Sequence, residues 1–311
     1  MSVSPVAPFQ RKVGGAASKF DRLGRRKIWS LSMKILSAGA VAVVLTPLFL
    51  VIYQAILLGG SVISFSFFTS LPPLACSPQP GVSCAAGGVA NGIQGTLIVV
   101  GLASLIAIPI AVVAAIYLVE YDVRRSGSIV SFAADVLTGV PSIIVGMFIY
   151  AILVIYYPQI VFSVVAGSFA LAVLMIPIIT RTSEEALRTV PHSMREAALA
   201  LGIPKWRTSL QITLVAALPG VVTGCLFGVM RAAGETAALL LTLFGSQRFF
   251  QGLTEPAAAL PLQIYVYGTS PYLNWQQLAW GATLVLIGLV LVLSVISRLV
   301  LDRLARRMRG G

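Results

Sequence analysis

Long stretches without any ionisable side chain divide this chain of 311 residues. No Asp, Glu, Lys, Arg or His occurs from Ile35 to Val119, and three further runs cover Val136–Thr180, Thr208–Met230 and Pro256–Ser297. The first run opens with an apolar segment at 35–58, which as a helix would be about 36 Å long. Because a bilayer's hydrocarbon core is about 30 Å thick, this pattern predicts membrane-spanning helices.

The rest of the first run predicts a second span and the other three runs predict four more, which makes the chain an all-α integral membrane protein with about six transmembrane helices. The second run, Val136–Thr180, is too long for one span, and Tyr156-Tyr-Pro158-Gln159 is a plausible turn within it. The expected spans are 35–58, 93–119, 129–155, 160–179, one that starts near 209, and 276–299.

The segments between and around these spans complete the expected organisation. They are a basic N-terminal tail at 1–34, an outer loop at 59–92, a permease domain at 93–300 that contains an inner loop at 181–208, and a C-terminal tail at 301–311.

Composition supports a membrane protein, since 58% of the residues are hydrophobic and only 10% are charged, against about 25% in soluble domains. The formal net charge is +12. Twenty of the 22 Lys and Arg residues fall in alternate segments, on the side of both termini. The positive-inside rule makes that side cytoplasmic. Anionic lipid heads then suffice as partners for the basic tails, and no nucleic-acid partner is expected.

Cysteine and histidine usage narrows the possible chemistry. Cys76 and Cys84 both fall in the outer loop, where an oxidising compartment would let them pair, although two unpaired small residues fit equally well. Cys225 falls inside the fifth span and is expected to be a small core residue. With His192 as the only histidine, we expect no metal site.

The inner loop contains two sequences of the capping-box type, Thr182-Ser-Glu-Glu185 and Ser193-Met-Arg-Glu196. With Pro191 and Gly202 as stops, they predict a helix–turn–helix pair. The second helix, about Met194–Leu201, is too short to be stable alone, so it must dock on something. Its small-residue face suits a protein groove, and an amphipathic helix on the membrane surface is the alternative.

Charges also interrupt the apolar stretches at two places. Arg231 and Glu235 are four residues apart and would share a helix face. They fit either a structural ion pair or an anion site facing a polar path. The uncharged stretch around them exceeds one span, so a kink or an early end is expected, with Pro219-Gly220 as the weak point. For Asp135 we expect either snorkelling to the cytoplasmic interface or pairing with Arg124 or Arg125, in preference to a transport role.

Glu196-Ala-Ala-Leu-Ala-Leu-Gly202, followed by Ile212 and Leu214, resembles the EAA loop of ABC importer permeases, although Val215 stands where that family usually has Pro. The resemblance implies the type I ABC importer permease fold. It also implies a coupling helix that seats in a cleft of a cytoplasmic ATPase subunit, through Met194, Glu196, Ala197, Ala198, Leu201 and Gly202.

Further segments are similar to the phosphate-specific (Pst) permeases, and more to their PstA branch than to PstC. They are Thr180-Arg-Thr-Ser-Glu-Glu-Ala186, Arg231-Ala-Ala-Gly-Glu-Thr-Ala-Ala238 and Ala257-Ala-Ala-Leu-Pro-Leu-Gln-Ile264. This resemblance implies phosphate as the substrate and places Arg231, Glu235 and Thr236 on its path. It further implies a PstC-like second permease, a PstB-like ATPase dimer and a PstS-like extracytoplasmic phosphate-binding protein as partners.

Other functions fit the sequence less well. The chain has no Gly-x-x-x-x-Gly-Lys-Ser/Thr loop, so it is not expected to be the ATPase itself. As a transport subunit it is not expected to be an enzyme, and a partner would bind ATP and magnesium while this chain holds no cofactor. A membrane-embedded enzyme would need a cluster of catalytic side chains within the spans. A secondary transporter would show repeats and need no docking helix. A permease for sulfate or molybdate remains the closest alternative.

Overall fold

The computed structural model describes residues 15–76, 87–121 and 126–309. The chain divides into two compact units, Met1–Gln54 and Ala55–Gly311, and each is described by itself. Throughout the described residues the regular structure is helical, apart from one isolated β-bridge between Phe244 and Ala257.

The first unit contains one helix, α1 (Gly15–Gln54), of 40 residues. It begins twenty residues before the predicted span at 35–58, and the apolar part of the helical segment covers Trp29–Gly59. Large apolar side chains are exposed around it, including Leu36 at 69% and Val43 at 74%. A helix that is apolar on all sides is expected of a segment surrounded by lipid.

The second unit holds the remaining helices, and most of the predicted spans correspond to one of them. In chain order they are η1 (Ala55–Gly59), α2 (Phe65–Thr69), α3 (Ala90–Glu120), α4 (Ser126–Gly139), α5 (Ser142–Tyr156), η2 (Pro158–Ile160), α6 (Val164–Arg188), α7 (His192–Ala200), α8 (Lys205–Arg207), η3 (Thr208–Thr213), α9 (Leu214–Ala233), α10 (Ala237–Thr242), α11 (Leu260–Gly268) and α12 (Leu273–Arg309).

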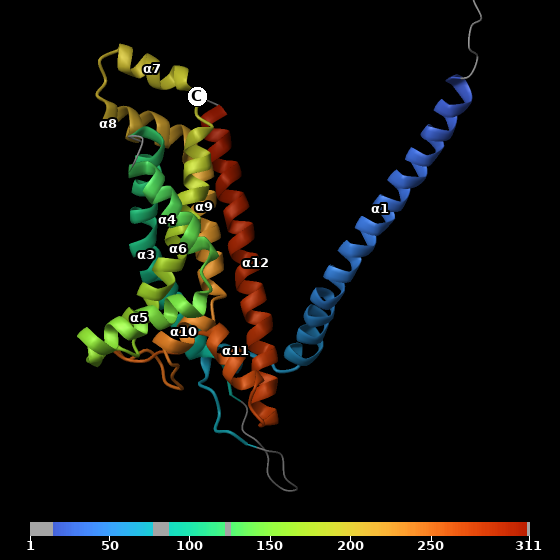
Figure 1. Cartoon of the computed structure of the whole chain (residues 1–311). Helices are drawn as coiled ribbons and strands as arrows, with labels where there is room; N and C mark the ends of the chain where they lie inside the picture. Colours follow the sequence, from blue (N-terminus) through green and yellow to red (C-terminus); the bar gives the residue numbers. More distant parts are fainter. Residues whose placement is uncertain (1–14, 77–86, 122–125, 310–311) are drawn as a thin grey trace, which may run out of the picture. The chain divides into compact units, whose positions relative to one another are not determined.

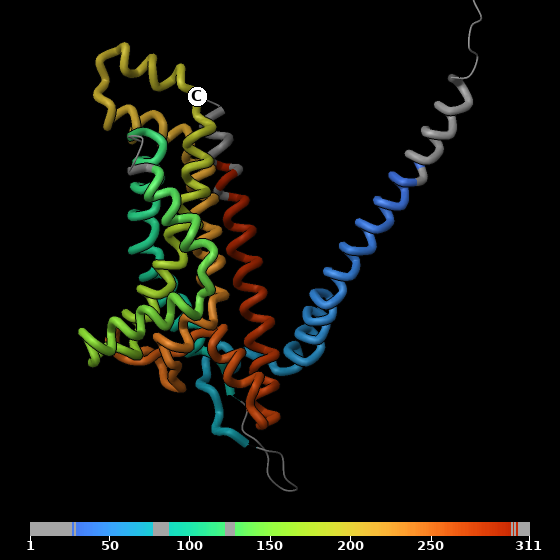
Figure 2. The backbone as a smooth tube through the Cα atoms, viewed as in Figure 1, coloured from blue at the N-terminus to red at the C-terminus, as the bar shows by residue number. Residues whose placement is uncertain are grey.

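Five helical segments of the described chain are long and apolar enough to cross a membrane, and a sixth exists if α4 and α5 form one span. The structure corrects the prediction of one straight helix at 129–155, because α4 and α5 meet at 106°. Figure 2 shows the backbone turning at this point. Gly139 and Pro141 stand at the break, and a proline cannot continue the hydrogen-bond ladder of a helix.

Small residues let the long helices approach closely. Ala103, Ala107, Ala111 and Ala115 lie four residues apart along α3, and all are fully buried. α9 carries a matching stripe of Gly220, Gly224 and Gly228 against α6. A Cβ on these three glycines would lie 2.4 Å from Ala186, 2.9 Å from Thr182 and 2.7 Å from Ile179. Small residues of this kind are typical of helix contacts within membranes.

The predicted helix–turn–helix pair is wrong in its first half. α6 runs without a break from Val164 to Arg188, so Thr182 lies inside it, and its hydroxyl donates to the Ile178 carbonyl oxygen at 2.8 Å. The second predicted cap also fails, since α7 begins one residue before Ser193 with Pro191 at its N-cap position. Because buried contacts hold α6, a local capping sequence does not decide where the helix begins.

Helix α9 does not break at Pro219-Gly220, as the sequence suggested, but ends at Ala233 with Gly234 as its C-cap. Beyond it, α10 and α11 are short helices that the sequence reasoning missed. Figure 1 places α10 and α11 at the end of the second unit opposite α7 and α8. These short helices therefore lie at the two ends of the bundle.

Candidate functional site

Arg231 and Glu235 lie at the junction where α9 ends and α10 begins. Arg231 is in the last turn of α9, and Glu235 follows the C-cap Gly234, with its backbone N–H donating to the Ala232 carbonyl at 3.2 Å. Thr236 is the N-cap of α10 and is half-buried. The chain therefore leaves the helix between the two charges, and they still face each other.

The pair is a loose one. Arg231 Nη2 lies 3.9 Å from Glu235 Oε2, the Arg231 side chain is 55% exposed, and the Glu235 side chain is 7% exposed. Among the described residues no hydrogen bond from the Arg231 guanidinium is recorded. A carboxylate buried behind an accessible guanidinium orients that group while leaving its N–H donors available. This arrangement suits reversible binding of a small oxyanion.

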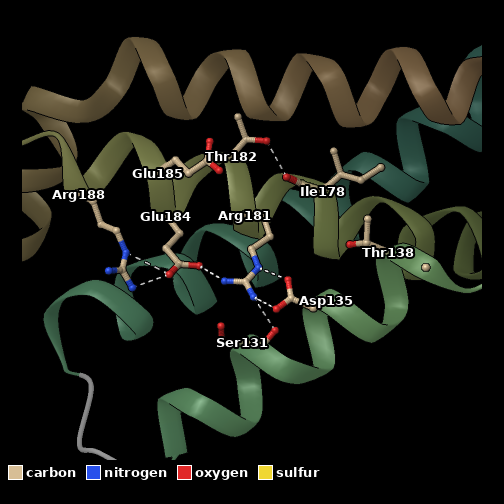
Figure 3. A pocket seen from close by; sticks show the side chains of 10 residues that line it. Ser131, Asp135, Thr138, Ile178, Arg181, Thr182, Glu184, Glu185 and Arg188 are labelled. Atoms are coloured by element: carbon tan, nitrogen blue, oxygen red, sulfur yellow. Dashed lines mark hydrogen bonds and ion pairs between the residues drawn. The ribbon is translucent and has the colours of Figure 1, made fainter.

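A second cluster of charges lies between α4 and α6 and borders an open cavity of about 980 Å³ (Figure 3). Arg181 is at its centre. Its Nε donates to Asp135 Oδ1 at 2.9 Å, its Nη1 to Glu184 Oε2 at 2.8 Å, and its Nη2 to the Ser131 carbonyl at 2.8 Å. Arg188 donates to Glu184 Oε1 at 2.8 Å. One guanidinium thus joins α4 to α6.

Asp135 has a partner in this cluster that the sequence did not indicate. Its partner in the structure is Arg181, and Arg124 and Arg125 lie outside the described residues. The sequence reasoning missed the cluster because it treated Arg181 and Arg188 only as loop charges for orientation. Asp135 and Arg181 are 46 residues apart, so no spacing in the sequence indicates this pair.

The predicted coupling residues lie on and just after α7. Met194, Glu196, Ala197, Leu201 and Gly202 are exposed, whereas Ala198 is 4% exposed and faces the rest of the chain. Leu199, which was not predicted, adds a third large apolar side chain to Met194 and Leu201, and these three are 47%, 43% and 81% exposed. Exposed large apolar side chains on a short helix are typical of an interaction site.

Gly202 ends α7 as predicted. Its φ of +78° is left-handed, its N–H donates to Leu199 O at 2.9 Å, and the Ile203 N–H donates to Ala198 O at 3.2 Å. These two bonds form a Schellman motif. The glycine therefore fixes the direction in which the chain leaves α7.

The outer loop is attached to the beginning of α12. Asn274 Oδ1 accepts from the Cys76 backbone N–H at 3.2 Å, and Trp275 Nε1 donates to the Pro73 carbonyl at 3.0 Å. Cys84 lies outside the described residues, so pairing of Cys76 with Cys84 stays a prediction. Cys225 is a free cysteine, half-buried against the core. Among the described residues there is no group of three potential metal ligands.

The known proteins that this chain resembles are membrane components of transport systems. Residues 84–310 match the family described as binding-protein-dependent transport system inner membrane component. The phosphate transport system permease protein PstA of Yersinia pestis is 40% identical over 252 residues, which cover 80% of this chain and 82% of that protein. The protein of the same name from Haemophilus influenzae is 38% identical over 275 residues, 88% of this chain and 94% of that one.

Solved structures with a similar fold belong to ABC transporters. An inward-facing structure of the MetNI methionine ABC transporter has a TM-score of 0.59 at 18% identity, and the match covers 70% of this chain and 95% of that one. A bacterial alginate ABC transporter in complex with an alginate-bound periplasmic protein has a TM-score of 0.60 at 14% identity, covering 91% and 96%. At these identities the likeness concerns the fold alone.

Proposed function

This chain belongs to the family of binding-protein-dependent transport system inner membrane components, within the group of PstA phosphate transport permeases, and we propose from this that it conducts inorganic phosphate into the cell. It is a multi-pass inner-membrane permease subunit of an ABC importer with further subunits.

The observation that carries the phosphate proposal is the accessible guanidinium of Arg231, next to the buried carboxylate of Glu235. Phosphate presents two oxygens that match the planar fork of an arginine. The carboxylate 3.9 Å away orients the fork and repels the anion, which favours release over permanent binding. Thr236, one residue further, supplies a hydroxyl at the same junction.

The proposed partners supply the ATP-binding loop that the sequence does not contain and cover the apolar side chains that α7 exposes. An ATPase dimer is proposed to receive α7 through Met194, Leu199 and Leu201, which are exposed. A second permease completes the conduit, and an extracytoplasmic phosphate-binding protein delivers the substrate. ATP binding closes the ATPase dimer, α7 moves with it, and the spans alternate their opening by rigid-body motion.

The proposed orientation places α7, α8 and both termini in the cytoplasm. Twenty of the 22 Lys and Arg residues then lie on the inner side. The end of the bundle with α10, α11 and the loop around Cys76 would face the binding protein (Figure 1).

Uptake of labelled phosphate by phosphate-starved cells tests the proposal, with variants of this chain replacing the wild-type chain. We expect Arg231→Ala to lower uptake by about tenfold or more, since a charge-assisted hydrogen bond contributes about 1.5–3 kcal/mol. Arg231→Lys keeps the charge but loses the fork, so it should retain part of the uptake.

Arg248→Ala is the matched control, because Arg248 is an exposed arginine that no acidic partner accompanies among the described residues. It should leave uptake unchanged at equal membrane abundance. Normal uptake by Arg231→Ala at normal abundance would remove Arg231 from the phosphate path.

A further inference from the structure

Arg195 is the one charged residue of α7 that is buried. The residue is 9% exposed, whereas the neighbouring Glu196 is exposed. Helix α7 is nine residues long and shows its apolar side chains to the outside, so it needs an anchor to the rest of the chain. Arg195 is buried, whereas the apolar side chains proposed to contact the ATPase, Met194, Leu199 and Leu201, are exposed.

The guanidinium of Arg195 reaches the ends of two long helices. Its Nη2 donates to the Leu187 carbonyl at 2.9 Å, in the last turn of α6, where helix carbonyls lack partners within the helix. Its Nε lies 2.8 Å from Oε1 of Glu120, the last residue of α3. The N–H does not point directly at that oxygen, so this second contact is an ion pair and not a hydrogen bond.

Both members of the ion pair are shielded from water, since their side chains are 11% and 6% exposed. Neither Arg195 Nε nor Glu120 Oε1 has a hydrogen-bond partner within the described part of the chain. Separating them would leave a buried charge without compensation, which is costly. The pair therefore resists being pulled apart when α7 is displaced.

The other groups near Arg195 do not replace this contact. The small cavity beside it is lined by Leu118, Val119, Arg188 and His192, and Arg188 is engaged with Glu184. α7 also packs on η3, at the beginning of the span that contains α9. Among the described residues, the pair with Glu120 and the bond to Leu187 are the polar links of α7 to α3 and α6.

We infer that Arg195 is the positioning residue that transmits displacement of α7 to the ends of α3 and α6, through Glu120 and the Leu187 carbonyl. α3 and α6 pack along their length through the alanine stripe, so movement of their ends moves the centre of the permease. This inference rests on the proposed function, because it assigns a role within ATP-driven transport. It concerns the transfer of motion and not the binding of phosphate.

The test uses the complete importer reconstituted in vesicles with its ATPase, second permease and binding protein. Phosphate uptake and ATP hydrolysis are measured together for Arg195→Ala, Glu120→Gln and the charge exchange Glu120→Arg with Arg195→Glu. Each single variant should lower the number of phosphate ions taken up per ATP about tenfold, and the exchange should recover a substantial part of it, as expected of directly coupled residues. Arg207→Gln, an exposed cation of the same loop, should keep the wild-type ratio.

Retention of the ATPase subunit on the purified complex is measured for every variant, and Arg195→Lys is included as a milder change that keeps the charge. An unchanged ratio in both single variants would overturn the inference. The inference would also be overturned if the charge exchange recovered none of the lost phosphate uptake per ATP while Arg195→Lys kept the wild-type ratio. A wild-type importer that hydrolyses ATP but takes up no phosphate would instead refute the proposed function, and the response of ATP hydrolysis to the binding protein would still test Arg195.

Discussion

Arg181 connects residues that are distant in the sequence. Its guanidinium joins Asp135 and the Ser131 carbonyl on α4 to Glu184 on α6, and the Glu184 side chain is 6% exposed while that of Asp135 is 65% exposed. The two acidic partners should therefore respond differently to substitution. Burial and not the number of bonds sets the size of the effect.

Arg181→Ala is expected to destabilise the permease by about 3 kcal/mol, because it leaves the buried Glu184 with Arg188 alone. Asp135→Asn should cost less than about 1 kcal/mol, because Asp135 is largely exposed. Thermal unfolding of the detergent-purified complex measures both variants. A larger loss for Asp135→Asn would contradict this account of the cluster.

Gly202 is a residue whose backbone sets the geometry of the docking helix. At a φ of +78° a side chain costs about 1 kcal/mol, so Gly202→Ala should loosen the end of α7. Hydrogen exchange across residues 192–203 should become faster in this variant, while Gly202→Asn should be closer to wild type since asparagine tolerates this conformation. Equal protection in wild type and Gly202→Ala would be the contrary result.

At the level of elements, the contact between α6 and α9 depends on the glycine stripe. Gly220→Ala would place a Cβ 2.4 Å from the Ala186 Cβ, so one helix must shift, at a cost of about 1–3 kcal/mol. Gly101→Ala on α3 is the matched control, because nothing lies within 4 Å of its Cβ position. We expect a lower unfolding temperature for Gly220→Ala only. Similar temperatures for both variants would show that α6 and α9 are not in close contact there.

The helices show which parts of the fold can be predicted from the sequence and which cannot. Hydropathy alone placed the long helices, since a bilayer imposes a length and a composition on each span. The capping sequence at Thr182 was misleading, because tertiary contacts carry α6 through it. Helix α11 was missed, since its position depends on bonds between distant residues: Gln263 donates to Asn91 at 3.0 Å, and the Leu260 N–H donates to Thr96 at 2.8 Å.

Some contacts of the candidate sites could be predicted from the sequence and others could not. The pairing of Arg231 with Glu235 could be predicted from a spacing of four residues, and the exposure of Met194 and Leu201 from the pattern of the loop. The pairs of Arg181 with Asp135 and of Arg195 with Glu120 could not, because each joins helices separated by many residues. Long-range ion pairs leave no periodicity in one sequence.

For the whole molecule, the distribution of Lys and Arg predicts that both termini are cytoplasmic. A fluorescent protein fused after Gly311 should therefore fluoresce, and alkaline phosphatase fused within the outer loop after Cys76 should be active. An inactive phosphatase at that position together with a non-fluorescent C-terminal fusion would reverse the orientation, and would place α7 away from any cytoplasmic ATPase.

The measurement that tests the central claim most directly is accumulation of labelled phosphate by vesicles that contain this chain with its proposed partners. The account predicts accumulation that requires ATP hydrolysis and the binding protein, and that unlabelled phosphate inhibits while sulfate at the same concentration does not. Inhibition by sulfate as strong as that by phosphate would contradict the assigned substrate. Phosphate movement that proceeds equally well without ATP would contradict the importer itself.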